Sequence, residues 1–189
     1  MATTATGRVS EETYRRLALA AVDAQLELHD GRLREKPGMS VEHGSIMVDL
    51  VLALGPQLDR SEYRLRANHA KLRRSPRHYY VPDVAVIPAA LDLALRDHPG
   101  ALDAYSAPLP VVVEIWSPST GDYDIEEKLP EYMARGDLEI WYLHLYERTL
   151  IASRRQPDGT YAETRYTHGS APVLSLPGVE VDLDALFAP

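Results

Sequence analysis

The order of apolar and polar residues predicts two helices and a hairpin in the first third of the chain. Ser10 is placed to cap a helix whose apolar residues recur at helical spacing as far as about residue 25. The pair Asp30-Gly31 separates two short segments, which is typical of a β-hairpin. A second helix is predicted to begin after Ser40, and a Gly-Pro pair ends it at about residue 55.

Strands outnumber helices in the rest of the chain. Helical segments are predicted at 91–96, at 183–187 and in a stretch that follows a turn at 117–121 and ends at Gly136. We therefore expect an α/β protein with a mixed β-sheet flanked by helices and an N-terminal β-hairpin, in one domain, 1–189, with residues 1–9 as a flexible tail. The predicted strands are 62–66, 70–74, 80–87, 111–116, 138–145, the hairpin 149–155 and 160–166, and 179–182.

The composition excludes several kinds of site and several classes of protein. Cysteine is absent, which excludes disulfides and thiolate metal sites. No apolar run approaches the ~20 residues that cross a membrane, and the polar N-terminus has no signal-peptide core. We therefore expect a cytoplasmic protein with no membrane partner. The formal net charge of -8 argues against nonspecific binding of nucleic acid by the whole surface.

Basic residues are concentrated in one stretch, 64–78, which contains no Asp or Glu. A local basic strip on an acidic protein is the pattern expected of a site that binds a polyanion such as DNA. The alternative is a loop or hairpin whose charges are simply solvated. The stretch also contains His69 and His78, and the strip itself consists of Arg64, Arg66, Lys71, Arg73, Arg74 and Arg77.

Two carboxylates stand alone inside apolar segments that we predict to be buried strands. Asp83 lies within Val-Pro-Asp-Val-Ala-Val-Ile, and Glu114 follows Val-Val-Val. Burying an isolated carboxylate is costly unless its charge is offset. A divalent cation shared by Asp83 and Glu114 would offset both charges, because hard cations bind carboxylate oxygens. Structural ion pairs, or side chains that point to solvent, would explain the same pattern.

Asp124, Lys128 and Tyr132 are spaced four apart, so on one helix they would share a face. That helix follows the Glu114 strand, and its face can lie over the carboxyl end of the strand, where ligands of such sheets usually bind. An ammonium there would polarise a metal-bound water or stabilise a phosphate transition state. The alternative is a surface ion pair between Asp124 and Lys128.

The sequence lacks the motifs of several other catalytic and binding sites. The chain has no Gly-x-Ser-x-Gly element, no Gly-rich phosphate loop and no His-x-x-x-His pair on a helix. These absences argue against a hydrolase triad, a nucleotide-binding loop and a zinc site. Trp116 and Trp141 are expected to be core residues rather than platforms for stacked bases.

A longer pattern connects these residues. It consists of Pro82-Asp83, the run Glu114-Ile115-Trp116-Ser117-Pro118-Ser119-Thr120, then Asp124, Lys128, Tyr132, Gly136 and Glu139-Ile140-Trp141. This pattern resembles the Uma-type family of restriction endonucleases, which belongs to the PD-(D/E)XK nuclease superfamily. The similarity runs from about Glu27 to Phe187, and it implies a restriction-endonuclease-like fold.

The resemblance also implies an activity, the metal-dependent hydrolysis of DNA. Asp83 and Glu114 match the metal-binding acids, and the backbone carbonyl of Ile115 would be a further ligand of Mg²⁺ or Mn²⁺. Trp116 occupies the position of the superfamily's strand lysine, and Lys128 on the next helix would replace that lysine. Auxiliary roles would fall to Glu42, His43, Asp124 and Tyr132, although Glu42 also suits the first turn of a helix.

One residue that departs from the family pattern leaves an alternative function open. Pro130 follows Lys128 by two residues, and a proline inside a helix removes a hydrogen bond and kinks it. If the helix kinks there, Lys128 points away from the metal, and the chain is an inactive nuclease-fold module that binds nucleic acid or protein. A small-molecule metal hydrolase would also explain the two acids but not the basic strip.

We expect a homodimer, because two-fold pairing places two sites on a duplex.

Overall fold

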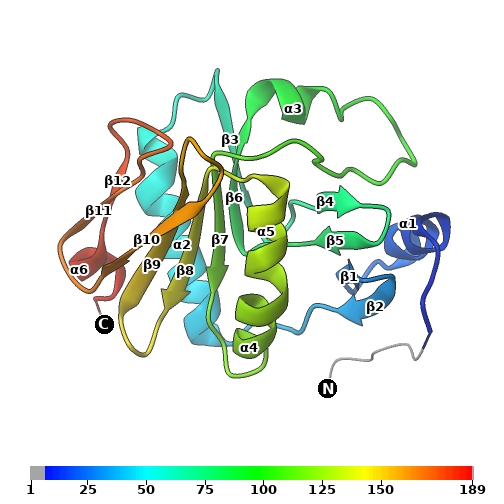
Figure 1. The fold of residues 1–189 in the computed structure, drawn as a ribbon, viewed down its shortest axis with the longest axis horizontal. Helices are drawn as coiled ribbons and strands as arrows, with labels where there is room; N and C mark the ends of the chain where they lie inside the picture. The colour runs from blue at the N-terminus through cyan, green and yellow to red at the C-terminus, as the bar shows by residue number, and fades with distance from the viewer. Residues whose placement is uncertain (1–6, 189) are drawn as a thin grey trace.

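A computed structural model describes residues 7–188, and a six-stranded mixed sheet lies at its centre (Figure 1). The strand order is β10-β9-β8-β7-β6-β3, and all neighbours are antiparallel except β7 and β8. Central β7 reads Val-Val-Val-Glu-Ile and is buried along its whole length, as expected of a strand covered on both faces. The strands are β3 (Tyr63–Ala67), β6 (Val84–Pro88), β7 (Val111–Ile115), β8 (Glu139–His144), β9 (Thr149–Arg155) and β10 (Tyr161–Tyr166).

Helices cover the two faces of this sheet, as predicted. Helix α2 (Val41–Leu54) packs Met47, Leu50 and Leu54 on one face, together with α6 (Leu183–Leu186) and the two-stranded sheet of β11 (Ser170–Pro172) and β12 (Glu180–Asp182). The other face is covered by α5 (Leu129–Arg135), whose Tyr132 joins a second apolar cluster. Figure 1 shows α5 in front of the sheet and α2 behind it.

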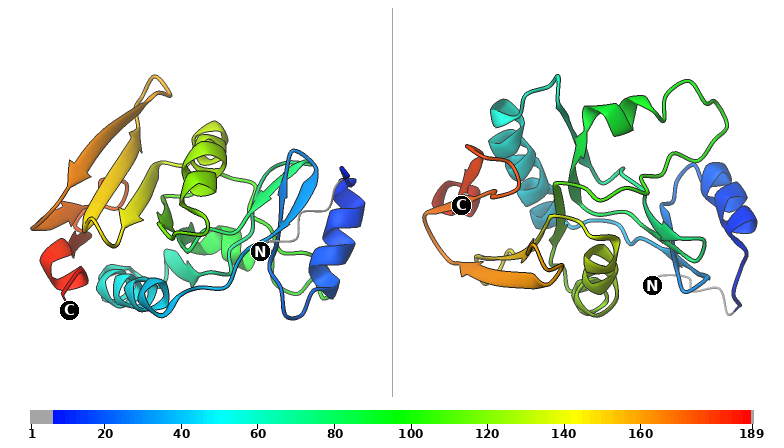
Figure 2. Two further views of the ribbon diagram at one scale, coloured as in Figure 1. Left: turned by 90° about the horizontal axis from the view of Figure 1, so that it is seen from below. Right: turned by 45° about the horizontal axis from the view of Figure 1, so that its top comes forward.

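A second sheet, β2-β1-β5-β4, stands at the other end of the molecule from β11 and β12 (Figure 2). Its β1 (Leu26–His29) and β2 (Arg32–Glu35) form the predicted hairpin, and Asp30 and Gly31 both have positive φ, as a two-residue type I′ turn requires. Helix α1 (Glu11–Ala20) packs against it through Tyr14. The remaining strands are β4 (Leu72–Ser75) and β5 (His78–Tyr80).

The structure corrects several predicted boundaries. The predicted strand 80–87 is two strands, β5 and β6, which belong to different sheets because Pro82 has no N–H for a continuous ladder. Helix α1 ends at Ala20, before a Val-Asp pair of low helix propensity. Strands β3 and β4 begin one and two residues later than predicted, and β11 was not predicted at all.

Further differences concern short segments. Helix α3 is Ala89–Leu93 rather than 91–96, and a 3₁₀ turn, Gly55–Gln57, follows α2. Of the predicted flexible tail, residues 1–6 lie outside the described residues. Arg8 and Val9 are not a tail, because Arg8 forms a β-bridge with Arg32 and the Val9 N–H donates to the Gly31 carbonyl. Among residues 7–188, no helix has the length and apolar character needed to cross a membrane.

Candidate active site

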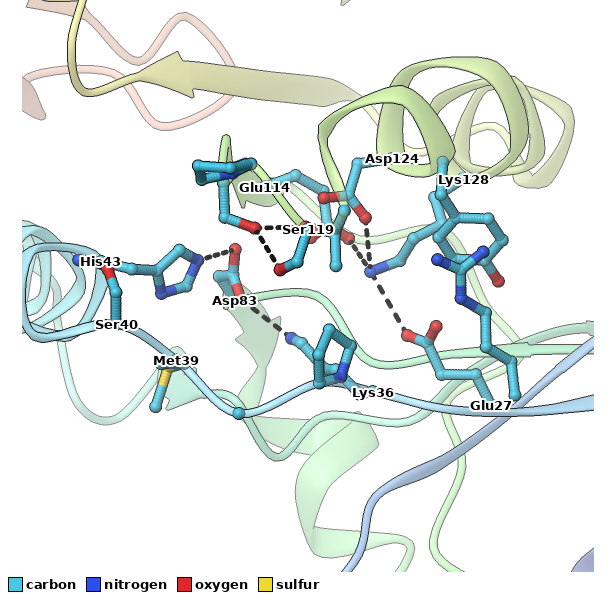
Figure 3. Close-up of a pocket in the computed structure, with 17 residues that line it drawn as sticks. Glu27, Lys36, Met39, Ser40, His43, Asp83, Glu114, Ser119, Asp124 and Lys128 are labelled. Atoms are coloured by element: carbon cyan, nitrogen blue, oxygen red, sulfur yellow. Dashed lines mark hydrogen bonds and ion pairs between the residues drawn. The ribbon is translucent and has the colours of Figure 1, made fainter. Parts of the chain in front are cut away.

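A pocket lies where the carboxyl end of β7 faces the four-stranded sheet (Figure 3). Its volume is about 160 Å³. Strands β1 and β2, the first turn of α2 and the turn 117–120 contribute its walls. Four carboxylic acids line it, against three Lys or Arg residues, so acidic groups are in excess. The acids are Glu27, Asp83, Glu114 and Asp124, and the bases are Arg34, Lys36 and Lys128.

Asp83 precedes β6 and is held at both oxygens. Its Oδ1 lies 2.9 Å from the Lys36 ammonium, and its Oδ2 lies 3.1 Å from His43 Nε2 and accepts the Ile115 N–H at 2.8 Å. Burial acts to raise the pKa of Asp83, but Lys36 and His43 outweigh it and hold the pKa below its ordinary value. Asp83 is therefore ionised and fixed in one orientation.

Glu114 lies on β7 and meets the helix that follows. Its Oε1 is 2.7 Å from the Lys128 ammonium and accepts a hydrogen bond from the Tyr132 hydroxyl at 2.6 Å. Burial raises the pKa of Glu114 to about 8; the Lys128 charge opposes this shift, whereas Asp124 and Asp83 add to it. Negative charge at Glu114 is thus incompletely compensated by the groups around it.

The Lys128 ammonium is shared by three carboxylates. Besides Glu114 it lies 3.3 Å from Glu27 Oε1 and 3.3 Å from Asp124 Oδ1, and the side chain is buried. Burial disfavours the ammonium, but Glu114 and Glu27 outweigh burial and raise the pKa of Lys128. Burial also raises the pKa of Asp124, against the effect of Lys128. Lys128 is consequently a fixed positive charge inside the pocket.

The helix around Pro130 explains why Lys128 points inward. Residues Gly121–Tyr123 (α4) lead into a π-helical turn, Asp124–Lys128, and then into α5. The Leu129 N–H donates to the Asp124 carbonyl, so the wider turn comes directly before Pro130, near the start of α5. π turns are rare in proteins and are often found at functional sites. With this turn before Pro130, the Lys128 side chain points into the pocket and not away from it.

The start of α2 separates the two auxiliary residues. Ser40 caps the helix by accepting the His43 N–H, and His43 is buried against Asp83. Among residues 7–188, His43 Nδ1 has no hydrogen-bond partner. Glu42 is exposed and does not line the pocket, which agrees with its alternative interpretation as a favourable first-turn acid.

Comparisons with known proteins identify the family and the fold of this chain. A family model, Uma2, described as "Putative restriction endonuclease", matches residues 11–185. The chain belongs to the Uma2 family. A solved structure of a "putative nuclease" of DUF820 from Anabaena variabilis shares the fold, with a TM-score of 0.76 and 16% identity over 95% of this chain and 97% of that chain. No curated protein matches the sequence. The predicted family and the predicted restriction-endonuclease-like fold are both confirmed.

Two residues that contact Asp83 or Lys128 in this Uma2 protein escaped the sequence analysis. Glu27 is buried on β1 and accepts the Val81 N–H at 2.8 Å, while Lys36 follows β2 and donates to the Val81 carbonyl at 2.8 Å. Glu27 carried one signal, a lone acid between two leucines of a predicted strand. Lys36 carried none, because only the packing of the hairpin against the Val81–Asp83 segment brings it to the pocket.

The structure divides the basic strip between the two sheets, and most of its arginines are paired with acids. Arg64 and Arg66 lie on β3 of the six-stranded sheet, whereas Arg73 and Arg74 lie on β4 of the other sheet. Four of the six are paired with acids: Arg66 with Asp92, Arg73 with Glu11, Arg74 with Glu131 and Arg77 with Asp30. Lys71 is partly buried, and burial lowers its pKa. Binding of DNA by this strip stays a prediction.

Asp83 and Glu114 provide a donor set that suits Mg²⁺ or Mn²⁺. Mg²⁺ is usually bound by one or two carboxylates and keeps several waters, and the uncompensated negative charge at Glu114 is the kind that a divalent cation relieves. No three His, Asp or Glu side chains among residues 7–188 converge as a ready-made metal site. The predicted Ile115 carbonyl ligand stays a prediction; what the structure shows is the Ile115 N–H donating to Asp83.

Proposed function

We propose that the chain hydrolyses phosphodiester bonds of DNA with Mg²⁺ or Mn²⁺ held by Asp83 and Glu114. The observation that carries the proposal is the meeting of these two acids with Lys128 in one buried pocket at the end of β7. Membership of the Uma2 family supports a nuclease. The cation, when bound, would lower the pKa of a water and neutralise charge that develops on the phosphate.

The chain's own residues set up the rest of the chemistry. Lys128 keeps its proton because carboxylates surround it, so its ammonium can stabilise the negative charge that develops on the phosphate oxygens. Glu27 and Asp124 fix the position of that ammonium. Tyr132 donates its hydroxyl hydrogen to Glu114, which orients that carboxylate. Each of these groups is pre-positioned, which reduces reorganisation during the reaction.

Asp83 is oriented from three directions at once. His43, Lys36 and the Ile115 N–H all contact it, so its carboxylate cannot rotate without breaking a hydrogen bond. We propose Lys36 and His43 as positioning residues for Asp83 rather than as groups that touch the phosphate.

Nicking of supercoiled plasmid DNA tests the proposal. With Mg²⁺ or Mn²⁺ the native protein should nick the plasmid, and Asp83→Asn, Glu114→Gln and Lys128→Met should each lower the rate by at least about 100-fold, a loss typical of removing one preorganised electrostatic group. Glu42→Gln is the matched control, since this exposed acid lies outside the pocket. Nicking that survives Glu114→Gln at the native rate would overturn the assignment.

The alternative predicted from the sequence, an inactive nuclease-fold module, has one observation in its favour. Lys36 and Lys128 already contact Asp83 and Glu114 and neutralise part of their charge. Absence of cleavage of both plasmid and single-stranded DNA by the native protein in either metal, with its fold intact, would favour that module. The homodimer, the cytoplasmic location and the single domain stay predictions.

A further inference from the structure

An aromatic cluster that the proposed chemistry does not use lies beside the turn 117–120, which lines the pocket. Trp116 and His144 stack, with ring centroids 4.4 Å apart and planes 25° apart. Tyr146 meets the edge of this pair, 5.7 Å from Trp116 and 85° to it. Trp116 is only two residues beyond Glu114, so the cluster lies next to the proposed catalytic groups along the chain. Contrary to the sequence prediction, Trp116 is half-buried rather than part of the core; Trp141 is in the core.

One turn connects the cluster with the pocket. The turn 117–120 lines the pocket on one side and, on the other, a hollow of about 320 Å³ that Trp116 also lines. Arg34 lines both hollows, and its guanidinium lies 3.4 Å from the centre of the Tyr123 ring. A strand whose phosphate enters the pocket would therefore have the flat side chains of Arg34 and Trp116 beside it, with His144 and Tyr146 in contact with Trp116.

Trp116 has a structural role in this cluster, whereas Tyr146 has none. A Cβ at Gly121 would lie 2.1 Å from Trp116 Nε1, so Trp116 packs directly on the backbone of the turn. Tyr146 is 58% exposed and comes from the loop after β8. An exposed aromatic ring on such a cluster is the type of surface on which nucleobases stack.

The burial of the reacting groups favours a single-stranded over a double-stranded substrate. Asp83, Glu114 and Lys128 are each no more than 2% exposed and lie in a pocket of about 160 Å³. A phosphate in a regular duplex is flanked by stacked, paired nucleotides, and unstacking them costs a few kcal/mol, least for a strand that is already single. An unpaired strand can therefore bring its phosphate to these groups at lower cost.

The charge distribution points in the same direction. A protein that tracks a duplex needs a continuous basic surface, and here Arg73, Arg74 and Arg77 are paired with acids while Arg64 and Arg66 lie on another sheet. Stacking of bases on aromatic rings supplies affinity without such a surface, since it acts on the bases rather than on the phosphates.

We propose that the substrate is an unpaired nucleic-acid strand, in which a base next to the scissile phosphate stacks on Tyr146 and the Trp116–His144 pair. This inference rests on the proposed phosphodiesterase function and names its substrate class. The shared chemistry of single-stranded DNA and RNA, a flexible phosphodiester chain with free bases, is what the surface recognises.

Binding of short oligonucleotides tests the proposal without any turnover. The probes are fluorescently labelled (dT)8, (rU)8 and an 8-base-pair DNA duplex, titrated with protein in Ca²⁺ and again in EDTA and followed by anisotropy. We expect (dT)8 or (rU)8 to bind more tightly than the duplex, and the tighter of the two identifies the sugar. Because Trp141 is buried and Trp116 is half-buried, quenching of intrinsic fluorescence by the bound strand should report on Trp116.

Substitutions at Tyr146 provide the specific readout. Tyr146→Ala should weaken binding of the single strand by roughly 5- to 150-fold, because stacking of one base is worth about 1–3 kcal/mol. Tyr146→Phe keeps the ring and should bind like the native protein. Leu52→Ala, at an exposed apolar residue of α2 outside both hollows, should change nothing.

Two results would overturn the inference: a duplex that binds as tightly as the single strands, or unchanged single-strand affinity in Tyr146→Ala. Failure of the proposed function looks different. If the native protein cleaves no substrate yet binds single strands through Tyr146, the phosphodiesterase proposal fails and the binding inference holds. If the protein nicks duplex plasmid and shows no dependence on Tyr146, the function holds and the substrate class is wrong.

Discussion

Replacing Glu114 by Gln should make the metal-free protein less sensitive to rising pH. In the native protein Glu114 is buried, and its pKa is raised from 4.5 to about 8. Between these values the folded protein binds more protons than the unfolded chain does, so the free energy of unfolding decreases as the pH rises. Gln keeps the size of the side chain and an oxygen that Lys128 and Tyr132 can reach, but it has no proton to lose.

The size of the effect follows from the shift. Each pKa unit corresponds to about 1.4 kcal/mol, so between pH 5 and pH 8 the native protein should lose about 3 kcal/mol of stability that Glu114→Gln keeps. For a chain of 189 residues this equals a relative change in melting temperature of about 6 to 12 °C. Asp124 and Asp137, with raised pKa values, act in the same direction, and His78, with a lowered pKa, acts in the opposite one. All three groups are present in both proteins, so the difference between the two reports mainly on Glu114 and on its coupling to Asp124.

Thermal melts in EDTA from pH 5 to pH 9 measure this difference. The lowered pKa of Asp83 affects stability only below its ordinary value of 3.8, and the raised pKa of Lys128 only above 10.5, so neither enters this range. We expect the melting temperature of the native protein to fall relative to that of Glu114→Gln as the pH rises. Parallel curves for the two proteins would refute the claim that Glu114 is a buried acid with uncompensated charge.

Three further predictions test other parts of the structure. Arg135→Met should destabilise the protein by about 3–5 kcal/mol in chemical denaturation, because it leaves the buried Asp137 carboxylate without its partner; adding Asp137→Asn should recover part of the loss. Gly121→Ala should cost about 1–3 kcal/mol, because the new Cβ displaces Trp116, and equal stability would mean that the turn has room. If Arg73 and Arg74 contact phosphates, replacing both by Ala should reduce the slope of log K against log salt by about 2; an unchanged slope would leave them only in their ion pairs with Glu11 and Glu131.

The apolar pattern predicted most of the fold because the elements it identified have one buried side or are buried throughout. β7 and the hairpin around Asp30-Gly31 were found this way, and so was α2 between Ser40 and the Gly-Pro pair. The split of segment 80–87 was missed, although Pro82 was its physical cause. A run of β-branched residues indicates burial but does not say to which sheet each half belongs.

His43 was predicted from the family resemblance, whereas residue patterns alone predicted the site only where a residue broke a pattern or shared a helix face with another. Asp83 and Glu114 stood out because they interrupt apolar strands, and Lys128 because it is four residues from Asp124 and from Tyr132. Lys36 and the aromatic platform depend on contacts between segments far apart in the chain, such as Lys36 with Val81 and Trp116 with His144. Sequence spacing holds no information on such pairs. The π turn before Pro130, which sets the direction of the Lys128 side chain, could not be predicted from sequence spacing either.

Soaking crystals of the protein in Mn²⁺ and measuring its anomalous scattering tests the central proposal most directly. We predict one Mn²⁺ in the pocket, with oxygens of both Asp83 and Glu114 at about 2.0–2.6 Å, the range of hard-cation contacts with carboxylates. Lys36 and Lys128 should give up part of their present contacts with these acids, at 2.9 and 2.7 Å, to admit the ion. A pocket without Mn²⁺ at saturating concentration, with both lysines still in place, would contradict a metal-dependent nuclease.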